Sequence, residues 1–303
     1  MSRQACPDPR SARPHDGLGK EIEPVGKDLG GFSVRRVLPA PGQRSLGPFI
    51  FFDHMGPSVL RPGQGIDVRP HPHIGLSTLT YLFEGEITHR DSLGVVQSIR
   101  PGAVNWMTAG RGIVHSERTG PDARTTESRL HGIQTWIALP VDEEEAEPAF
   151  FHHPAETLPI IEMPKVWMRL VAGTACGERS PVATSSGMFY LDARLGRGAR
   201  FELPNEFSER GVYVVKGSVS ADGVMFQANR MLIPPAGQNF ELTAEADSRL
   251  IILGGDPLAE PRHMWWNLVS SRRERIEQAK TDWKAGLFPV VPGETEFIPL
   301  PED

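Results

Sequence analysis

The sequence has few cysteines and no long apolar segment. Only Cys6 and Cys176 occur among its 303 residues, so a disulfide framework is excluded. No stretch approaches the roughly 20 consecutive apolar residues that span a bilayer. The first residues, MSRQACPDPRSARPHDG, also lack the apolar core of a signal peptide. These absences predict a protein of the reducing cytoplasm that has no membrane partner.

The sequence also lacks an excess of positive charge. Lys and Arg number 32 against 38 for Asp and Glu, and the formal net charge is -6. A surface with this balance provides no broad basic field for a phosphate backbone, so direct binding to nucleic acid is not expected. Turn formers are abundant instead, because 31 Gly and 28 Pro are spread along the chain. This density predicts many short strands.

The strand pattern is all-β, and it occurs twice. Runs rich in Val, Ile, Phe and Thr, such as FSVRRVL and IQTWIALP, alternate with Gly and Pro. YLFEGEI resembles YVVKGSV further on, and NWMTAG resembles LIPPAG. The matched glycines lie 132 residues apart for Gly85 and Gly217, and 127 apart for Gly110 and Gly237. Matches in the same order at similar spacing predict a duplicated β unit, and therefore two barrels in one chain.

The two series and their flanks divide the chain into four predicted parts. These are a polar N-terminal tail over 1–24, a first barrel over 25–150, a second barrel over 151–256, and a C-terminal helix and extended tail over 257–303. The acidic, Pro-flanked segment VDEEEAEPAFFHHP separates the two barrels. The last residues, FPVVPGETEFIPLPED, are too rich in Pro to be helical and are expected to lie extended over a domain surface.

One helix is predicted near the C-terminus, in RRERIEQAKTDWK. Ile276, Ala279 and Trp283 lie along one stripe of this segment, and Ser271 followed by Glu274 forms a capping-box pattern at its start. Its charges are mixed in sign, which favours a packed surface helix over one that binds nucleic acid.

Two pairs of potential metal ligands lie in predicted strands of the first barrel. RPHPHIG places His71 and His73 two residues apart, and GRGIVHSE does the same for His115 and Glu117. Residues two apart in a strand point to the same face, so pairs on neighbouring strands can converge on one point. A lone buried histidine is more often a hydrogen-bonded core residue, but two such pairs favour a metal site.

Three imidazoles and one carboxylate suit a divalent transition metal ion, which leaves iron, manganese, nickel, copper and zinc open. A tetrahedral site with four protein ligands would be closed and structural. An octahedral ion would keep about two positions open for water, oxygen or substrate. The remaining histidines of this barrel, His54, His89 and His131, are expected to be hydrogen-bonded or to support the ligands from outside.

The second barrel is predicted to be free of metal. The offsets of 132 and 127 carry the four candidate ligands onto residues that do not fit a metal site. These residues are Leu203, Asn205, Leu242 and Ala244. A small error in the offsets would not change this, because no histidine lies between His153 and His263.

Several of these segments resemble the pirin family of two-domain cupins. The resemblance lies in HPHIGLSTLTYLFEG, HRDSLG and above all NWMTAGRGIVHSE, while HMWWNLVSSRRERIEQAKTDWKAGLFP is similar to the end of many bacterial pirin-like proteins. It runs from about Gly31 to the C-terminal helix. It implies two cupin-type β-barrels, a bicupin, with the C-terminal helix packed across them. The family's metal ligands then fall on His71, His73, His115 and Glu117, with iron as the expected ion.

The chain departs from the wider cupin pattern at one place. Many cupins and some pirins carry a Glu four or five residues after the two histidines, where this chain has Ser77 and Thr78. In pirins the position of Glu117 supplies the carboxylate, so the site is expected to survive. Chemistry that needs a second acid in the pocket is not expected.

The resemblance implies two functions. Pirin-like proteins resemble cupin quercetinases, which implies a metal-dependent dioxygenase of flavonol, quercetin-like substrates, with Glu117 as both ligand and catalytic proton acceptor. The alternative is a redox-responsive, iron-binding regulatory partner of a transcription factor or metabolic enzyme, without turnover. A mainly structural bicupin is disfavoured because the ligand set is intact. Likeness of fold does not decide whether the protein is an enzyme.

A few side chains bear on this choice. The aromatic and apolar residues near the ligands suit a pocket for a flat apolar substrate, but they serve equally well as barrel core. They are Phe51, Phe52, Trp106 and Met107. Gln134 lies on a strand whose other face is aliphatic, so it is expected to point into the barrel.

Overall fold

The computed structural model describes residues 12–15, 17–28 and 32–302. The chain divides into two compact units. One combines the described residues of Met1–Lys27 with Arg35–Asp53 and Glu156–Pro257, and it carries the second barrel. The other combines the described residues of Asp28–Val34, His54–Ala155 and Leu258–Asp303, and it carries the first barrel together with the C-terminal region.

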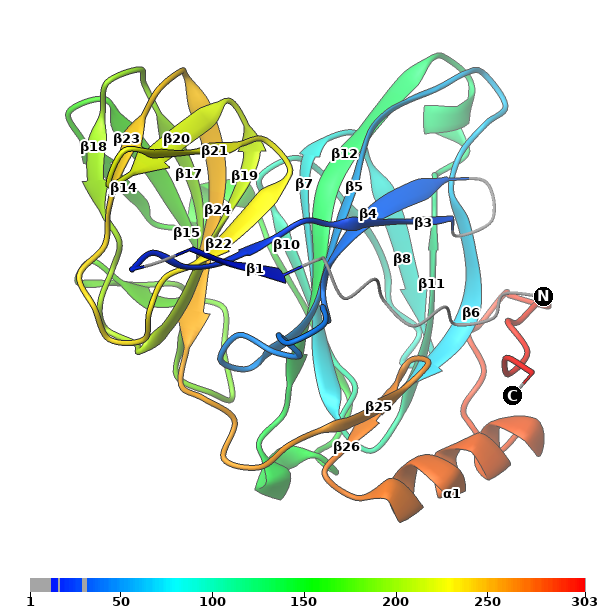
Figure 1. The fold of residues 1–303 in the computed structure, drawn as a ribbon. Helices are drawn as coiled ribbons and strands as arrows, with labels where there is room; N and C mark the ends of the chain where they lie inside the picture. Colours follow the sequence, from blue (N-terminus) through cyan, green and yellow to red (C-terminus); the bar gives the residue numbers. More distant parts are fainter. Residues whose placement is uncertain (1–11, 16, 29–31, 303) are drawn as a thin grey trace. The chain divides into compact units, whose positions relative to one another are not determined.

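The first barrel is built from two antiparallel sheets (Figure 1). The larger has the order β13-β10-β7-β12-β5-β4-β3, with bounds β3 (Val25–Asp28), β4 (Ser33–Leu38), β5 (Phe49–Leu60), β7 (Leu76–Glu84), β10 (Val104–Thr108), β12 (Ser128–Ala138) and β13 (Ala149–His153). The smaller has the order β6-β11-β8-β9, with bounds β6 (Asp67–His73), β8 (Ile87–Asp91), β9 (Val96–Ile99) and β11 (Ile113–Arg118). Strands β3, β4 and β5 contain residues of both units.

The second barrel also has two sheets. The larger has the order β1-β2-β22-β19-β24-β17-β15-β14, with β16 pairing β15. Its bounds are β1 (Ala12–His15), β2 (Gly19–Ile22), β14 (Ile160–Met163), β15 (Val166–Ala175), β16 (Glu178–Arg179), β17 (Met188–Leu195), β19 (Glu209–Lys216), β22 (Arg230–Ile233) and β24 (Ser248–Gly255). The smaller has the order β18-β23-β20-β21, with bounds β18 (Arg200–Glu202), β20 (Ser218–Ala221), β21 (Val224–Gln227) and β23 (Glu241–Ala244).

The two barrels repeat one strand order. The smaller sheets, β6-β11-β8-β9 and β18-β23-β20-β21, correspond strand for strand along the chain. The larger sheets share the same correspondence over β10-β7-β12-β5 and β22-β19-β24-β17. The two barrels predicted from the spacing of the sequence matches are therefore confirmed, and they fit the bicupin that the family resemblance implies.

Glycine turns explain why the repeat is visible in the sequence. Gly85 follows β7 with φ of 89°, and Gly217 follows β19 with φ of 84°. A Cβ atom at Gly85 would lie 2.1 Å from the carbonyl oxygen of Arg129, and one at Gly217 would lie 2.3 Å from Oγ of Ser248. Both turns therefore require glycine, which preserves the match between YLFEG and YVVKG.

The C-terminal region adds a hairpin and a helix to the first-barrel unit. The hairpin pairs β25 (His263–Trp265) with β26 (Leu268–Ser270), and α1 (Arg273–Lys284) follows near the end of the chain (Figure 1). Ile276 and Ala279 are buried in one cluster with Ile74 and Leu268, as the predicted stripe requires. The C-terminal helix is confirmed.

The start of α1 differs from the predicted capping box. The residue before the helix is Arg272, which makes no side-chain capping hydrogen bond. The hydroxyl of Ser271 donates instead to the carboxylate of Glu144, which also accepts the backbone N–H of Ser271. An acid from a distant turn therefore takes the place of the local Glu274, because the buried carboxylate of Glu144 needs hydrogen-bond donors and this segment supplies several of them.

The predicted polar tail over 1–24 also differs in part from the structure. Its described residues include β2, which pairs with β22 of the second barrel from Lys20 against Ile233 to Ile22 against Met231. Ile22 is fully buried there, and this burial gives the segment a fixed place. Cys6 lies outside the described residues.

The remaining helical elements are short. Three 3₁₀ turns occur among the described residues, at η1 (Asp122–Arg124), η2 (Val141–Glu143) and η3 (Ala155–Thr157). None of the helices that the structure describes has the length and apolar character needed to cross a bilayer.

Candidate metal centre

Strands β6 and β11 place the candidate ligands. His71 pairs directly with His115 across the two antiparallel strands, and His73 pairs with Ile113. β6 contains Pro70 and Pro72, which have no N–H to donate. Because β6 lies at the edge of its sheet, it tolerates both prolines. The local sequence and the sheet order thus bring three histidines to one place.

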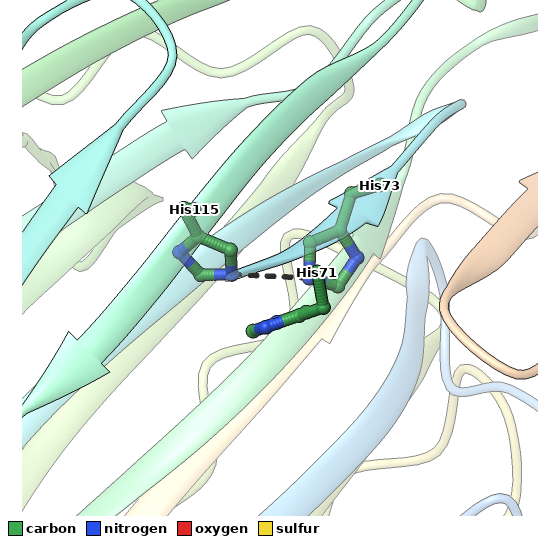
Figure 2. A group of neighbouring side chains, drawn as sticks. All are labelled: His71, His73 and His115. Carbon is green, nitrogen blue, oxygen red and sulfur yellow. Dashed lines mark hydrogen bonds between the residues drawn. The ribbon is translucent and has the colours of Figure 1, made fainter. Parts of the chain in front are cut away.

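The three imidazole rings turn toward one another in the interior (Figure 2). Their nearest nitrogens all lie within 4.8 Å of one another, and His73 Nε2 is 3.1 Å from His115 Nε2. His71, His73 and His115 are 6%, 1% and 1% exposed. The sequence prediction that these histidines converge is therefore met in the structure.

Backbone carbonyls fix the tautomers of two of these histidines. His71 Nδ1 lies 2.9 Å from the carbonyl oxygen of Arg69, and His73 Nδ1 lies 3.1 Å from that of Asn267. A carbonyl oxygen only accepts, so both Nδ1 atoms carry the proton in the neutral rings. Nε2 of His71 and of His73 is therefore left as a bare lone pair directed inward.

Burial keeps these rings neutral. It lowers the pKa of His71 to about 4 and the pKa of His73 and His115 well below 6.5, because the interior disfavours the charged imidazolium. A histidine must be neutral to bind a metal ion. At neutral pH all three rings are in the form that a ligand needs.

The donor set and its spacing fit a transition metal ion. Bare nitrogens 3.1 Å apart repel one another unless a proton or a cation lies between them. Two nitrogens bound at about 2.1 Å lie about 3.0 Å apart on neighbouring corners of an octahedron, and about 3.4 Å apart in a tetrahedron. The separation of His73 and His115 lies within this range.

Glu117 lies on the same strand but outside the group formed by the three histidines. Its carboxylate accepts hydrogen bonds from Gln134 Nε2, at 3.0 and 3.2 Å to its two oxygens, and from Thr80 Oγ1 at 3.3 Å. Burial raises the pKa of Glu117 above its ordinary value, although the hydrogen bond from Gln134 opposes the shift. Gln134 thus points into the barrel as predicted, while Glu117 stays a predicted ligand.

The other residues named in the sequence analysis lie in several different parts of the structure. His54 and His131 form a pair with their Nε2 atoms 2.8 Å apart, and His89 is hydrogen-bonded to His115. Trp106 and Met107 are buried in β10. Phe51 and Phe52 are buried as well, but they belong to the unit that carries the second barrel.

Sequence reasoning missed residues that come from distant parts of the chain. Asn267 binds His73 from 194 positions away, and the Trp136 ring lies 5.1 Å from the His73 ring. Local spacing carries no signal for either contact. The turn position of Asn267, directly after a residue with φ of 51°, becomes clear only once the hairpin is seen.

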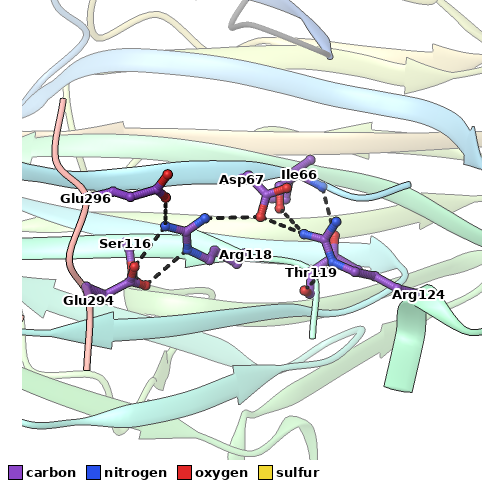
Figure 3. A network of polar contacts seen from close by, with 8 residues as sticks. All are labelled: Ile66, Asp67, Ser116, Arg118, Thr119, Arg124, Glu294 and Glu296. Carbon is purple, nitrogen blue, oxygen red and sulfur yellow. Dashed lines mark hydrogen bonds and ion pairs between the residues drawn. The ribbon is translucent and has the colours of Figure 1, made fainter. Parts of the chain in front are cut away.

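The outward-facing residues of β11 hold the C-terminal tail (Figure 3). Arg118 donates to the carboxylate of Glu294 through Nε at 3.0 Å and Nη2 at 2.8 Å, and Ser116 donates to it at 2.9 Å. Further along, the backbone N–H of Ile298 donates to the carbonyl oxygen of Pro70. The tail therefore lies against the two strands that carry the histidines.

Comparison with known proteins agrees with this arrangement. The sequence profile of the pirin family matches residues 31–137, and that of the pirin C-terminal cupin domain matches residues 190–289. A pirin-like protein of Caulobacter vibrioides is 50% identical over 281 residues, covering 91% of this chain and 96% of that protein.

Solved structures share the fold. A crystal structure of a quercetin 2,3-dioxygenase from Acinetobacter baumannii has a TM-score of 0.86 at 32% identity, covering 93% of this chain and 95% of that one. A bacterial pirin from Escherichia coli, determined in complex with nickel(II), has a TM-score of 0.62 at 24% identity, covering 78% and 96%. With both family profiles matched in order and the two barrels in place, the chain belongs to the pirin family.

Proposed function

We propose that this pirin-family protein is a metal-dependent dioxygenase of flavonol, quercetin-like aromatics. The observation that carries the proposal is the buried convergence of three histidine nitrogens from two neighbouring strands. The likeness to the quercetin 2,3-dioxygenase from Acinetobacter baumannii, at 32% identity and 93% coverage of this chain, supports the substrate class.

The chain's own residues define how the ion is held. His71, His73 and His115 bind it through Nε2, and Glu117 is the proposed fourth ligand. Three nitrogens and one oxygen suit a divalent transition metal ion. Iron is the ion that the family resemblance implies, with manganese, nickel, copper and zinc as the other candidates. When bound, such an ion supplies Lewis-acid and redox chemistry.

Glu117 is the proposed proton acceptor. It takes the proton of the flavonol hydroxyl at a carboxylate oxygen. Gln134 and Thr80 orient the carboxylate through the hydrogen bonds described above. Ser77 and Thr78 are buried neutral hydroxyls, so the proposed reaction uses Glu117 as its acid–base side chain.

The test is oxygen consumption by the iron-loaded protein across a panel of flavonols and catechols, with metal content measured on the same samples. We expect uptake with flavonols by the wild type. The Glu117→Gln variant, refilled with iron, is expected to lose about 10²–10⁴-fold in turnover, the usual contribution of a positioned general base. Glu202→Gln, an exposed carboxylate-to-amide change in the second barrel, is the matched control and should leave turnover unchanged.

Two outcomes would contradict the proposal. Absence of oxygen uptake by metal-replete wild type with every flavonol would exclude the dioxygenase, and the redox-responsive regulatory partner would become the function to test. Wild-type turnover in refilled Glu117→Gln would leave Glu117 as a ligand only and remove it as the base.

A further inference from the structure

His115 differs from the other two histidines in how its outer nitrogen is satisfied. His71 and His73 donate to backbone carbonyl oxygens, whereas His115 Nδ1 lies 3.2 Å from Nδ1 of His89. His89 is on β8, the strand next to β11, where it pairs with Glu117. A side chain therefore takes the role at His115 that the backbone takes at the other two ligands.

His89 is in turn held by Asp91. His89 Nε2 lies 2.9 Å from Asp91 Oδ2, and the two side chains are 5% and 0% exposed. Asp91 Oδ1 accepts the backbone N–H groups of Leu93 at 2.9 Å and Val95 at 3.1 Å. These N–H donors occupy Oδ1, which leaves Oδ2 to accept the proton of His89.

One arrangement of protons satisfies every contact when His115 offers Nε2 to a metal ion. Nδ1 of His115 then carries the proton and donates to Nδ1 of His89, and Nε2 of His89 donates to Asp91 Oδ2. In this arrangement the proton of His115 lies on its outer nitrogen, and Nε2 is left bare toward His71 and His73, as a metal ligand requires.

Packing holds the His89 ring in the orientation this chain of hydrogen bonds needs. The Phe150 ring stacks on it with centroids 4.4 Å apart and an interplanar angle of 21°. Stacking from β13 and the hydrogen bond within β8 leave the imidazole little freedom to rotate. The arrangement is thus fixed from two elements of the same unit.

We propose that His89 and Asp91 are positioning residues of the metal centre, which fix the tautomer of His115 and strengthen its Nε2 as a ligand. The negative charge of Asp91, passed through His89, makes His115 a better donor, and this favours the more highly charged state of a redox-active ion. The proposal rests on metal binding by the three histidines. It does not need dioxygenase turnover, so a protein that consumes no oxygen can still pass its test.

The test measures the Kd of the metal-free protein for zinc and cobalt(II) by chelator competition, together with the cobalt(II) absorption spectrum. In His89→Leu the Nδ1–H of His115 loses its acceptor, and we expect metal affinity to fall by about 10–100-fold, the usual loss for such outer contacts. His89→Gln restores a side-chain oxygen that can accept from His115, so it should recover part of the affinity and the wild-type spectrum.

Asp91→Asn removes the charge and the acceptor for His89 together. Its single side-chain oxygen should stay with the backbone N–H groups of Leu93 and Val95, which turns the amide NH2 toward Nε2 of His89. Metal affinity should therefore fall, as in His89→Leu, and the midpoint potential of the iron-loaded protein should rise. This variant also keeps the test open if His89→Leu fails to fold.

His54→Leu is the matched control, because it removes another buried, hydrogen-bonded histidine from the same unit. It should leave Kd, spectrum and potential unchanged. An equal loss of affinity in His89→Leu and His54→Leu, no rescue by His89→Gln, or an unchanged potential in Asp91→Asn would each overturn the proposal.

Discussion

The smaller sheets of the two barrels share one strand order but have opposite interiors. In the first barrel β6 and β11 bring His71 opposite His115, while in the second β18 and β23 bring Phe201 opposite Leu242. Leu203, Leu242 and Ala244 are buried in the apolar cluster of the second barrel, at or next to positions that match the candidate ligands. One backbone scaffold therefore accepts either a polar triad or an apolar core.

The polar interior of the first barrel and the apolar interior of the second should contribute differently to metal binding and to stability. Burying three imidazoles with bare nitrogens costs free energy, because the nitrogens lose their water without gaining protein donors. A bound cation offsets this cost. The apolar residues of the second barrel stabilise the fold directly, by removing apolar surface from water. We therefore expect substitutions in the smaller sheet of the first barrel to affect metal content most. Equivalent substitutions in the smaller sheet of the second barrel should affect the free energy of unfolding most.

The largest effect is expected from His115→Ala. Wild-type protein should hold about one transition metal ion per chain, and this variant should bind it more than 100-fold more weakly, since a direct ligand should cost at least as much as the outer contacts that cost about 10–100-fold. Its unfolding should stay cooperative, because barrel burial supplies most of the stability in a domain of this size. Elemental analysis and thermal unfolding measure the two quantities.

Leu242→Ala is the matched change in the second barrel. It should lower the free energy of unfolding by about 2–5 kcal/mol, as large-to-small core changes do, with metal content unchanged. Two ions per chain in the wild type would show that the second barrel binds metal as well. Complete unfolding of metal-free His115→Ala would make the site structural and remove the contrast between the barrels.

The next largest effect is expected from acidification, which should lower the free energy of unfolding through the histidines of the first barrel. In the metal-free protein the pKa of His71 is lowered to about 4 by burial, and the pKa values of His73 and His115 are also lowered. In the unfolded chain they return to about 6.5. Between about pH 4 and 6.5 the unfolded chain binds protons that the folded chain does not, so the free energy of unfolding falls as pH falls through this window.

Urea unfolding of the metal-free protein at several pH values measures this dependence. The loss should reach the order of a few kcal/mol at the acidic end, and it should be reduced in His71→Asn. The free energy of unfolding of Leu242→Ala should change with pH as it does in the wild type, because this variant removes no titrating group. Equal pH dependence in His71→Asn and the wild type would contradict the burial of a neutral His71.

Local patterns in the sequence predicted much of this molecule. The alternation of strand residues and the glycine turns at Gly85 and Gly217 depend on nearby residues, so the barrels and their repeat were predictable. The H-x-H and H-x-E spacings likewise placed His71, His73 and His115 on shared faces. The inward position of Gln134 followed from the same alternation.

What the sequence left open depends on pairing between distant segments. Asn267 reaches His73 from a C-terminal hairpin, and Glu144 replaces the expected local cap of α1. β2 joins the second barrel from a segment whose composition resembles a polar tail. In each case burial or an unsatisfied polar group selects the partner, and neither can be read from spacing along the chain.

The smallest effect is expected at the C-terminal tail, through Glu294→Gln. Burial raises the pKa of Glu294, but hydrogen bonds from Arg118 and Ser116 and the charge of Arg118 outweigh it, so the pKa lies below its ordinary value. The Arg118 and Glu294 side chains are 23% and 10% exposed, and solvent weakens their ion pair. The variant should therefore lose about 1 kcal/mol or less, and the loss should shrink at high salt.

Hydrogen exchange at the Ile298 amide reports whether the tail stays in place, because this N–H donates to Pro70 on the strand of His71 and His73. It should exchange faster in Glu294→Gln. Glu296→Gln is the control, since Glu296 contacts the same Arg118 but is 57% exposed, and it should change exchange less. Metal content should match the wild type in both variants. A metal loss in Glu294→Gln comparable to that in His115→Ala would mean that the tail holds the site itself, since β6 and β11 would then need outside support to keep their histidines together.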